Sequence, residues 1–371
     1  MVTTLVNLML LAYGLLLFTA CFSVWRYVFR RLRQGQPILE QRAAPTVRWG
    51  LADVLGGTIL FIGIASMLQM LLMDMVSDGS FQVGDLTLEE RVAAIWGMVL
   101  GEMIVFVLLY LAIGLRGGSR QIFGQSASRF MDDVRIGVLA FCALCIPVLF
   151  IQMLAAYLIP YEHPLIDLLI ESPEAWILVP VVFSAVIAAP LFEEFAFRLV
   201  LQGWLEDWFQ HRLRGADEVL LGRIGKPTSV EPDRVMHDEP LVPILDEAQP
   251  LTAELQDGEA DNPYASPPVP SPAEPSEWGD LDNIHSKFDN VASWRVWLPT
   301  LVSAAVFALL HFGQGAAPIP LFFLALGLGY VFRKTRTLTA TLVVHFLLNG
   351  QSMLFLLVQI FLGDSLPAEV P

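Results

Sequence analysis

Long hydrophobic runs constrain this chain more than any other feature. A helix needs about 20 apolar residues to cross roughly 30 Å of hydrocarbon, and the sequence holds about eight stretches of this kind. They lie near 5–25, 51–73, 92–115, 136–159, 175–209, 296–312, 318–332 and 338–362. Hydrophobic residues make up 55% of the chain and charged residues only 16%, unlike an ordinary soluble protein. We therefore expect an all-α fold: a polytopic bundle of transmembrane helices.

Basic residues predict the orientation of this bundle, because Lys and Arg are retained on the cytoplasmic side of a membrane. The first, third, fifth and seventh loops hold nearly all of the 22 Lys and Arg residues. We therefore expect eight spans with both chain ends outside. The protein should be an integral multi-pass membrane protein, and the bacterial cell (inner) membrane is the favoured location.

One segment differs sharply in composition from the rest. Residues 216–293 hold most of the chain's net charge of −15, together with a Pro-rich run over 261–275. A segment so acidic and rich in proline buries too little apolar surface to offset its conformational entropy. We predict a disordered, acidic cytoplasmic insertion over 211–293. It divides the chain into N-terminal transmembrane helices (1–174) and a functional core made of 175–210 and 294–362.

Ionisable and amide side chains inside three of the spans are the candidate functional residues. Such groups are costly within a bilayer, so they tend to face the bundle interior and to serve function. They occur in the sequences APLFEEFAFRLVLQGW, FALLHFG and VVHFLLNG, and are Glu193, Glu194, Arg198, His311, His345 and Asn349.

Helical spacing separates the two adjacent glutamates. Glu194 and Arg198 are four residues apart and share one helix face, so we interpret them as a structural ion pair. Glu193 is turned away from that pair and is the better candidate for the reactive acid. Pro190 just before them offers a kink.

The remaining groups complete the parts of a water-attack mechanism. His345 and Asn349 are also four residues apart and can present an imidazole and an amide to one spot. A carboxylate, an imidazole and donors for an oxyanion suit hydrolysis of an acyl group. Glu102 lies mid-span, and we favour a structural hydrogen bond over a chemical role for it.

The order EExxxR, FxxxH and HxxxN resembles the CPBP (CAAX-processing and bacteriocin-processing) intramembrane protease family, the type II CAAX prenyl endopeptidases. The resemblance implies that Glu193 is the general base, with His311 sharing its water. It also implies that His345 and Asn349 form an oxyanion hole, and that Glu194 and Arg198 support the base. Leu199 stands where this family often has glycine.

An intramembrane endopeptidase is the favoured function, with membrane lipid and a protein or peptide substrate, lipidated or not, as partners and no nucleic acid. The absence of HExxH and the presence of Asn349, a poor zinc ligand, favour a mechanism without a cofactor. Zinc is the alternative, with Glu193, His311 and His345 as ligands. A catalytically idle scaffold or immunity protein and a proton-coupled transporter are the rival functions.

Overall fold

The computed structural model describes residues 2–42, 47–77, 86–116, 129–159, 164–210, 215–222 and 293–362. The described residues are helical or lie in turns and connections, with no strand among them, so the predicted all-α class is confirmed. Most of the acidic insertion, 223–292, lies outside the described residues. Residues 215–222 at its start are described, and they include the helix α9 (Ala216–Leu221). The expected disorder therefore does not extend to them.

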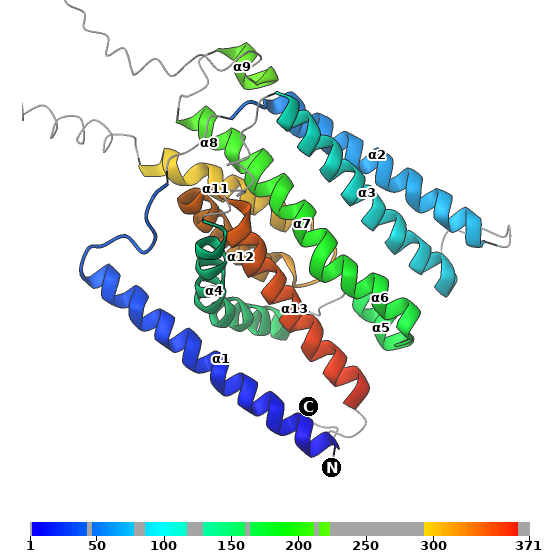
Figure 1. Cartoon of the computed structure of the whole chain (residues 1–371). Coiled ribbons are helices and arrows are strands. Elements are labelled where there is room, and N and C mark those ends of the chain that lie inside the picture. The colour runs from blue at the N-terminus through cyan, green and yellow to red at the C-terminus, as the bar shows by residue number, and fades with distance from the viewer. Residues whose placement is uncertain are drawn as a thin grey trace, which may run out of the picture. The chain divides into compact units, whose positions relative to one another are not determined.

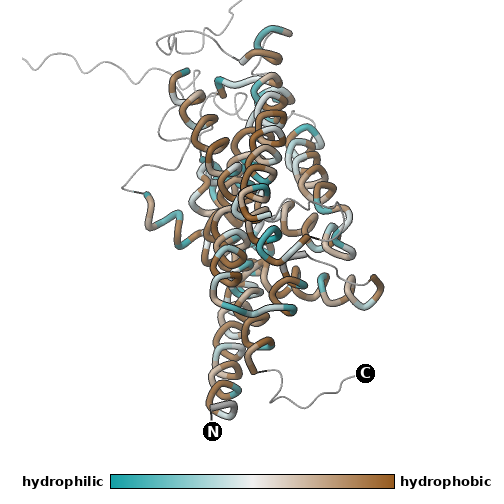
Figure 2. The backbone as a smooth tube through the Cα atoms, turned by 90° about the vertical axis from the view of Figure 1, so that its right-hand side faces the viewer, coloured by the Kyte–Doolittle hydropathy of each residue, from teal (hydrophilic) through white to brown (hydrophobic). Residues whose placement is uncertain are grey.

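Six helical stretches are long and apolar enough to cross a membrane. They include α1 (Val2–Arg33), α2 (Leu51–Val76), α3 (Leu88–Leu115), α4 (Phe130–Leu158), a composite stretch over Ala175–Phe209 and α13 (Leu338–Leu362). Two shorter apolar helices, α11 (Ser293–Leu309) and α12 (Pro318–Thr335), occupy the other two predicted positions. A short helix, α5 (Pro164–Glu171), precedes the composite stretch. Figure 2 shows how largely hydrophobic the long helices are.

The composite stretch contains two π-helical segments. It consists of α6 (Ala175–Phe183), the π-helical η2 (Ser184–Ala188), α7 (Ala189–Glu193), the π-helical η3 (Glu194–Gln202) and α8 (Gly203–Phe209). Pro190 lies two residues after the end of η2. A proline lacks an N–H and its ring crowds the preceding turn, which a wider turn relieves. A π-helical segment thus precedes the proline at which a kink was predicted, and π-turns often mark functional sites.

Helices α2 and α3 pack closely along a stripe of small residues (Figure 1). A Cβ added to Gly97 would lie 2.5 Å from the Cα of Gln69, and one added to Gly101 would lie 2.7 Å from the Cα of Ala65. Small residues four apart let membrane helices approach in this way. The other side of α3 packs against α6, η2 and α7, so α3 lies between α2 and the composite stretch.

Helices α4, α12 and α13 form a second group, to which α1 adds (Figure 1). Gly137 of α4 lies against Val343 of α13, and Gly327 of α12 lies against Leu144 of α4. Most large apolar side chains of α1 face outward, as expected of a lipid-facing helix. The composite stretch contacts both groups, and its polar residues therefore meet side chains from several helices.

Candidate active site

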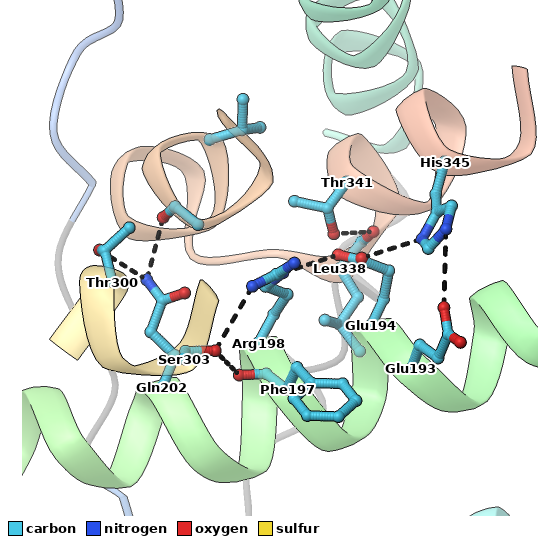
Figure 3. A network of polar contacts seen from close by, with 12 residues as sticks. Glu193, Glu194, Phe197, Arg198, Gln202, Thr300, Ser303, Leu338, Thr341 and His345 are labelled. Atoms are coloured by element: carbon cyan, nitrogen blue, oxygen red, sulfur yellow. Dashed lines mark hydrogen bonds and ion pairs between the residues drawn. The ribbon is translucent and has the colours of Figure 1, made fainter. Parts of the chain in front are cut away.

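The buried pair Glu194 and Arg198 forms the inner part of the site. The Nε of Arg198 lies 3.4 Å from Oε2 of Glu194, and both side chains are 0% exposed. Arg198 also donates from Nη1 to the Ser303 hydroxyl, which in turn donates to the carbonyl of Phe197 (Figure 3). The two charges neutralise each other in the protein interior, as the spacing of the motif predicted.

His345 connects this inner pair to Glu193. Its Nδ1 lies 3.1 Å from Oε1 of Glu194, and its Nε2 lies 3.6 Å from Oε2 of Glu193 (Figure 3). A carboxylate only accepts hydrogen bonds, so Nδ1 of His345 carries a hydrogen and donates it to Glu194. His345 is 2% exposed, and Nε2 is the nitrogen directed to Glu193.

His311 approaches Glu193 from a different element. It lies in the turn after α11, with Nδ1 2.9 Å from the carbonyl of Phe307 and Nε2 3.8 Å from Oε1 of Glu193. A carbonyl oxygen only accepts hydrogen bonds, so Nδ1 of His311 is the donor to Phe307. The sequence predicted that the span would continue to 312, but α11 ends at Leu309. His311 is therefore placed by a turn and not by a helix face.

Exposure distinguishes the two glutamates. The side chains of Glu193 and His311 are each 20% exposed, whereas Glu194 is fully buried. Glu193 is therefore the more accessible of the two carboxylates. The separations of 3.6 and 3.8 Å between Glu193 and the two histidines exceed hydrogen-bond length. Glu193 therefore lies close to both histidines without a direct hydrogen bond to either ring.

Phe307, the aromatic residue of FxxxH, packs these groups together. Its ring centroid lies 5.0 Å from that of His311 and 6.2 Å from that of His345. The guanidinium of Arg198 lies 5.4 Å from the same ring centroid, within the range of a cation–π contact. One apolar ring thus contacts both histidines and the buried cation.

Asn349 is not brought into contact with the carboxylates. Its amide donates to the carbonyl of Ala185, in η2, at 2.8 Å. His345 and Asn349 do face the same composite stretch, as their spacing predicted, but the structure records different partners for them. The amide has a second N–H, so the oxyanion role stays a prediction.

Glu102 is a site residue that the sequence did not place. It is 4% exposed, and its Oε2 has no hydrogen-bond partner, so the expected structural hydrogen bond is not present at that atom. An electrostatic interaction links it to Glu193. An acid inside a span was the only sign of Glu102 in the sequence, and it did not identify Glu193 as a neighbour.

A polar cluster next to the site was also not predicted. The Gln202 amide donates to Glu206 Oε1 at 2.9 Å, to the Thr300 hydroxyl at 3.2 Å and to the carbonyl of Gly329 at 2.9 Å (Figure 3 shows Gln202 and Thr300). Glu206 also pairs with Arg336. These contacts join the composite stretch to α11 and α12.

The chemistry of Glu193, His311 and His345 suits zinc ligation, since imidazole and carboxylate are its common ligands. Among the described residues, however, no group of three or more His, Cys, Asp or Glu side chains is placed to hold a metal ion. Zinc ligation by these three side chains therefore stays an alternative, and the chemistry proposed below uses the chain's own groups.

The fold and these contacts define a membrane protein with a partly exposed carboxylate next to two histidines, supported by a buried ion pair. Comparison with known families then identifies its C-terminal part: residues 284–351 match the model described as type II CAAX prenyl endopeptidase Rce1-like. This range is similar to the type II CAAX prenyl endopeptidases, as the resemblance predicted. No curated protein and no solved structure matches the chain.

The matched range includes His311, His345 and Asn349 but not Glu193 or Glu194. The two glutamates reach the site through the fold, because η3 of the composite stretch packs against α11 and α13. The contacts of Glu193 with both histidines are therefore an observation separate from the family match.

Proposed function

We propose that the protein is an intramembrane endopeptidase in which Glu193 activates water for attack on a peptide bond. The observation that supports this proposal best is the convergence of two histidine Nε2 atoms on the more exposed of two adjacent glutamates. Glu193 and Nε2 of His311 are both acceptors in this arrangement, and water has two hydrogens to donate to them. The Rce1-like match supports the same class of reaction.

In the proposed reaction, Glu193 takes one proton from water while His311 Nε2 holds the same molecule. The oxygen attacks the carbonyl carbon, and charge develops on the carbonyl oxygen. His345 Nε2, as an N–H of the protonated ring, and the free N–H of Asn349 are the proposed donors to that oxygen. The proton held by Glu193 then passes to the leaving amine. Glu194 and Arg198 take no part in proton transfer and hold His345 in place.

The substrate is proposed to be a protein or peptide at the membrane, with lipidation as an option. The proposed setting is the bacterial inner membrane, with 211–293 on the cytoplasmic side. These features rest on the resemblance, the basic loops and the composition of the chain.

Peptidase assay of the purified protein in lipid vesicles against a peptide library tests the proposal. Glu193→Gln should abolish turnover while the protein stays folded, because an amide cannot take the proton. The control is Glu171→Gln, at an exposed ion pair with Arg91, which should keep full activity. A fully active Glu193→Gln protein would refute the role of Glu193 as base.

Asn349→Ala separates the protease from a transporter and from an idle scaffold. A protease should lose about 10²–10³ in kcat with little change in KM, the loss of one oxyanion donor. Transport that survives this change, with no peptidase activity in the unaltered protein, would favour the transporter. Stoichiometric zinc in the active protein, with activity lost on chelation and restored by zinc, would replace the metal-free mechanism.

A further inference from the structure

Glu102, in the middle of α3, is a buried acid that the proposed reaction does not use. Its Oε2 is buried without a hydrogen-bond partner. No ion pair to Glu102 is found among the described residues. Buried polar atoms in native proteins are almost always paired, and an unpaired carboxylate within a membrane helix is costly. This residue therefore calls for a physical explanation.

Helix packing places Glu102 beside the catalytic carboxylate. Val99 and Phe106 lie three residues before it and four after it, and hence on the same face of α3. Val99 belongs to an apolar cluster that includes residues of η2, and the ring of Phe106 meets that of Phe195 edge-on at 4.9 Å. Glu102 thus lies on the face of α3 that packs against the composite stretch, and α3 contacts α7, the segment that ends at Glu193.

The opposite side of α3 fixes this orientation. Gly101 packs so closely on Ala65 that an added Cβ would lie 2.7 Å from its Cα, and Gly97 packs in the same way on Gln69. Rotating α3 about its axis would lose both close contacts. Glu102 is therefore held toward the composite stretch by the packing of α2.

We propose, on the basis of the proposed function, that Glu102 is a positioning residue of the same site. It is held as a neutral carboxylic acid whose O–H donates a hydrogen bond to the Glu193 carboxylate through one water. A neutral acid can donate where a carboxylate can only accept, and two neighbouring carboxylates resist ionising together. The bond would satisfy Glu102 and orient Glu193 toward His311 and His345. No covalent bond breaks or forms at Glu102.

Infrared spectroscopy tests this proposal without any activity measurement. The carbonyl stretch of a neutral carboxylic acid is separate from the bands of a carboxylate. Glu102→Gln should remove a neutral-acid band from the spectrum of the purified protein, and Glu193→Gln should shift that band. The exposed change Glu171→Gln should do neither. Loss of carboxylate bands in Glu102→Gln would overturn the proposal. A neutral-acid band that does not shift in Glu193→Gln would overturn it as well.

Kinetics of two further variants test the positioning role. Glu102→Gln keeps a hydrogen-bond donor of the same shape and should stay within about threefold of full activity. Glu102→Leu should lower kcat about 10–100-fold at unchanged KM, because one hydrogen bond to a charged group is lost. The control is Glu90→Gln on the same helix. Glu90 is also buried but accepts a capping hydrogen bond from Thr87, so its loss should affect stability and not kcat.

Equal losses in Glu102→Gln and Glu102→Leu, or full activity of Glu102→Leu, would refute the positioning role. If Glu102→Leu fails to fold, the infrared spectra and the activity of Glu102→Gln still test the positioning role of Glu102. Absence of peptidase activity in the unaltered protein would refute the proposed function instead. The infrared coupling between Glu102 and Glu193 would remain measurable in that case.

Discussion

Neutralising Arg198 alone should destabilise the protein more than neutralising Arg198 and Glu194 together. Both side chains are 0% exposed, and the Nε–Oε2 distance is 3.4 Å. Breaking a buried ion pair by removing one partner costs about 3–5 kcal/mol, because the other charge stays buried and uncompensated. This corresponds to about 10²–10⁴ in the folding equilibrium constant. Arg198→Met or Glu194→Gln alone should therefore give little folded protein.

The double variant removes both charges and should recover much of this loss. Its glutamine at 194 keeps an acceptor oxygen for Nδ1 of His345, which contacts Glu194 at 3.1 Å. The free energy of unfolding in mixed micelles, with the monodisperse fraction on gel filtration, gives the coupling energy of the cycle. We expect a coupling of about 2 kcal/mol or more, since desolvation of the remaining charge is avoided.

A matched cycle on an exposed pair provides the control. Arg91 and Glu171 are 2.7 Å apart with side chains 43% and 55% exposed. Such surface pairs contribute about 0–1 kcal/mol, so Arg91→Met and Glu171→Gln should be nearly additive. Additive losses at Arg198 and Glu194 as well would refute the reasoning and show that the two residues act separately.

Two further predictions concern packing and the insertion. Gly329→Ala should destabilise the protein by about 1–3 kcal/mol in thermal or denaturant unfolding. The added Cβ would lie 2.6 Å from Thr300 Cγ2 and 2.8 Å from Gln202 Oε1. In the control Gly14→Ala, the added Cβ has no atom within 4 Å, so this change should be neutral or slightly stabilising. Deletion of 223–292 should preserve membrane insertion, because a segment of this composition cannot form a core. Protease added to right-side-out cells should leave the segment intact. Efficient cleavage from outside would overturn the predicted topology.

The sequence predicted the features that depend on hydrophobicity and local spacing. The long apolar runs correspond to the long helices, since the bilayer thickness sets their length. The interval of four residues between Glu194 and Arg198 predicted their contact. The pairing survives in a π-helical segment, where the wider turn still leaves Nε and Oε2 3.4 Å apart.

The sequence could not predict what tertiary packing decides. The π-segments free backbone carbonyls that side chains from elsewhere satisfy: Ala185 accepts from Asn349, Phe197 from Ser303 and Val200 from the Trp49 indole. No local pattern identifies such acceptors, because the donors come from distant parts of the chain. The orientation of Glu102 likewise depends on the glycine contacts between α2 and α3.

One imidazole joins the structural and the proposed catalytic parts of this site. The nitrogens of His345 face adjacent residues, Nδ1 toward Glu194 and Nε2 toward Glu193. Adjacent residues of a helix point in different directions, so a single ring can meet both carboxylates only from one position between them. Movement of Glu194 must therefore turn the ring and displace Nε2 from Glu193. The buried ion pair with Arg198 restricts that movement, which gives a residue inaccessible to water a direct influence on the geometry around the accessible carboxylate.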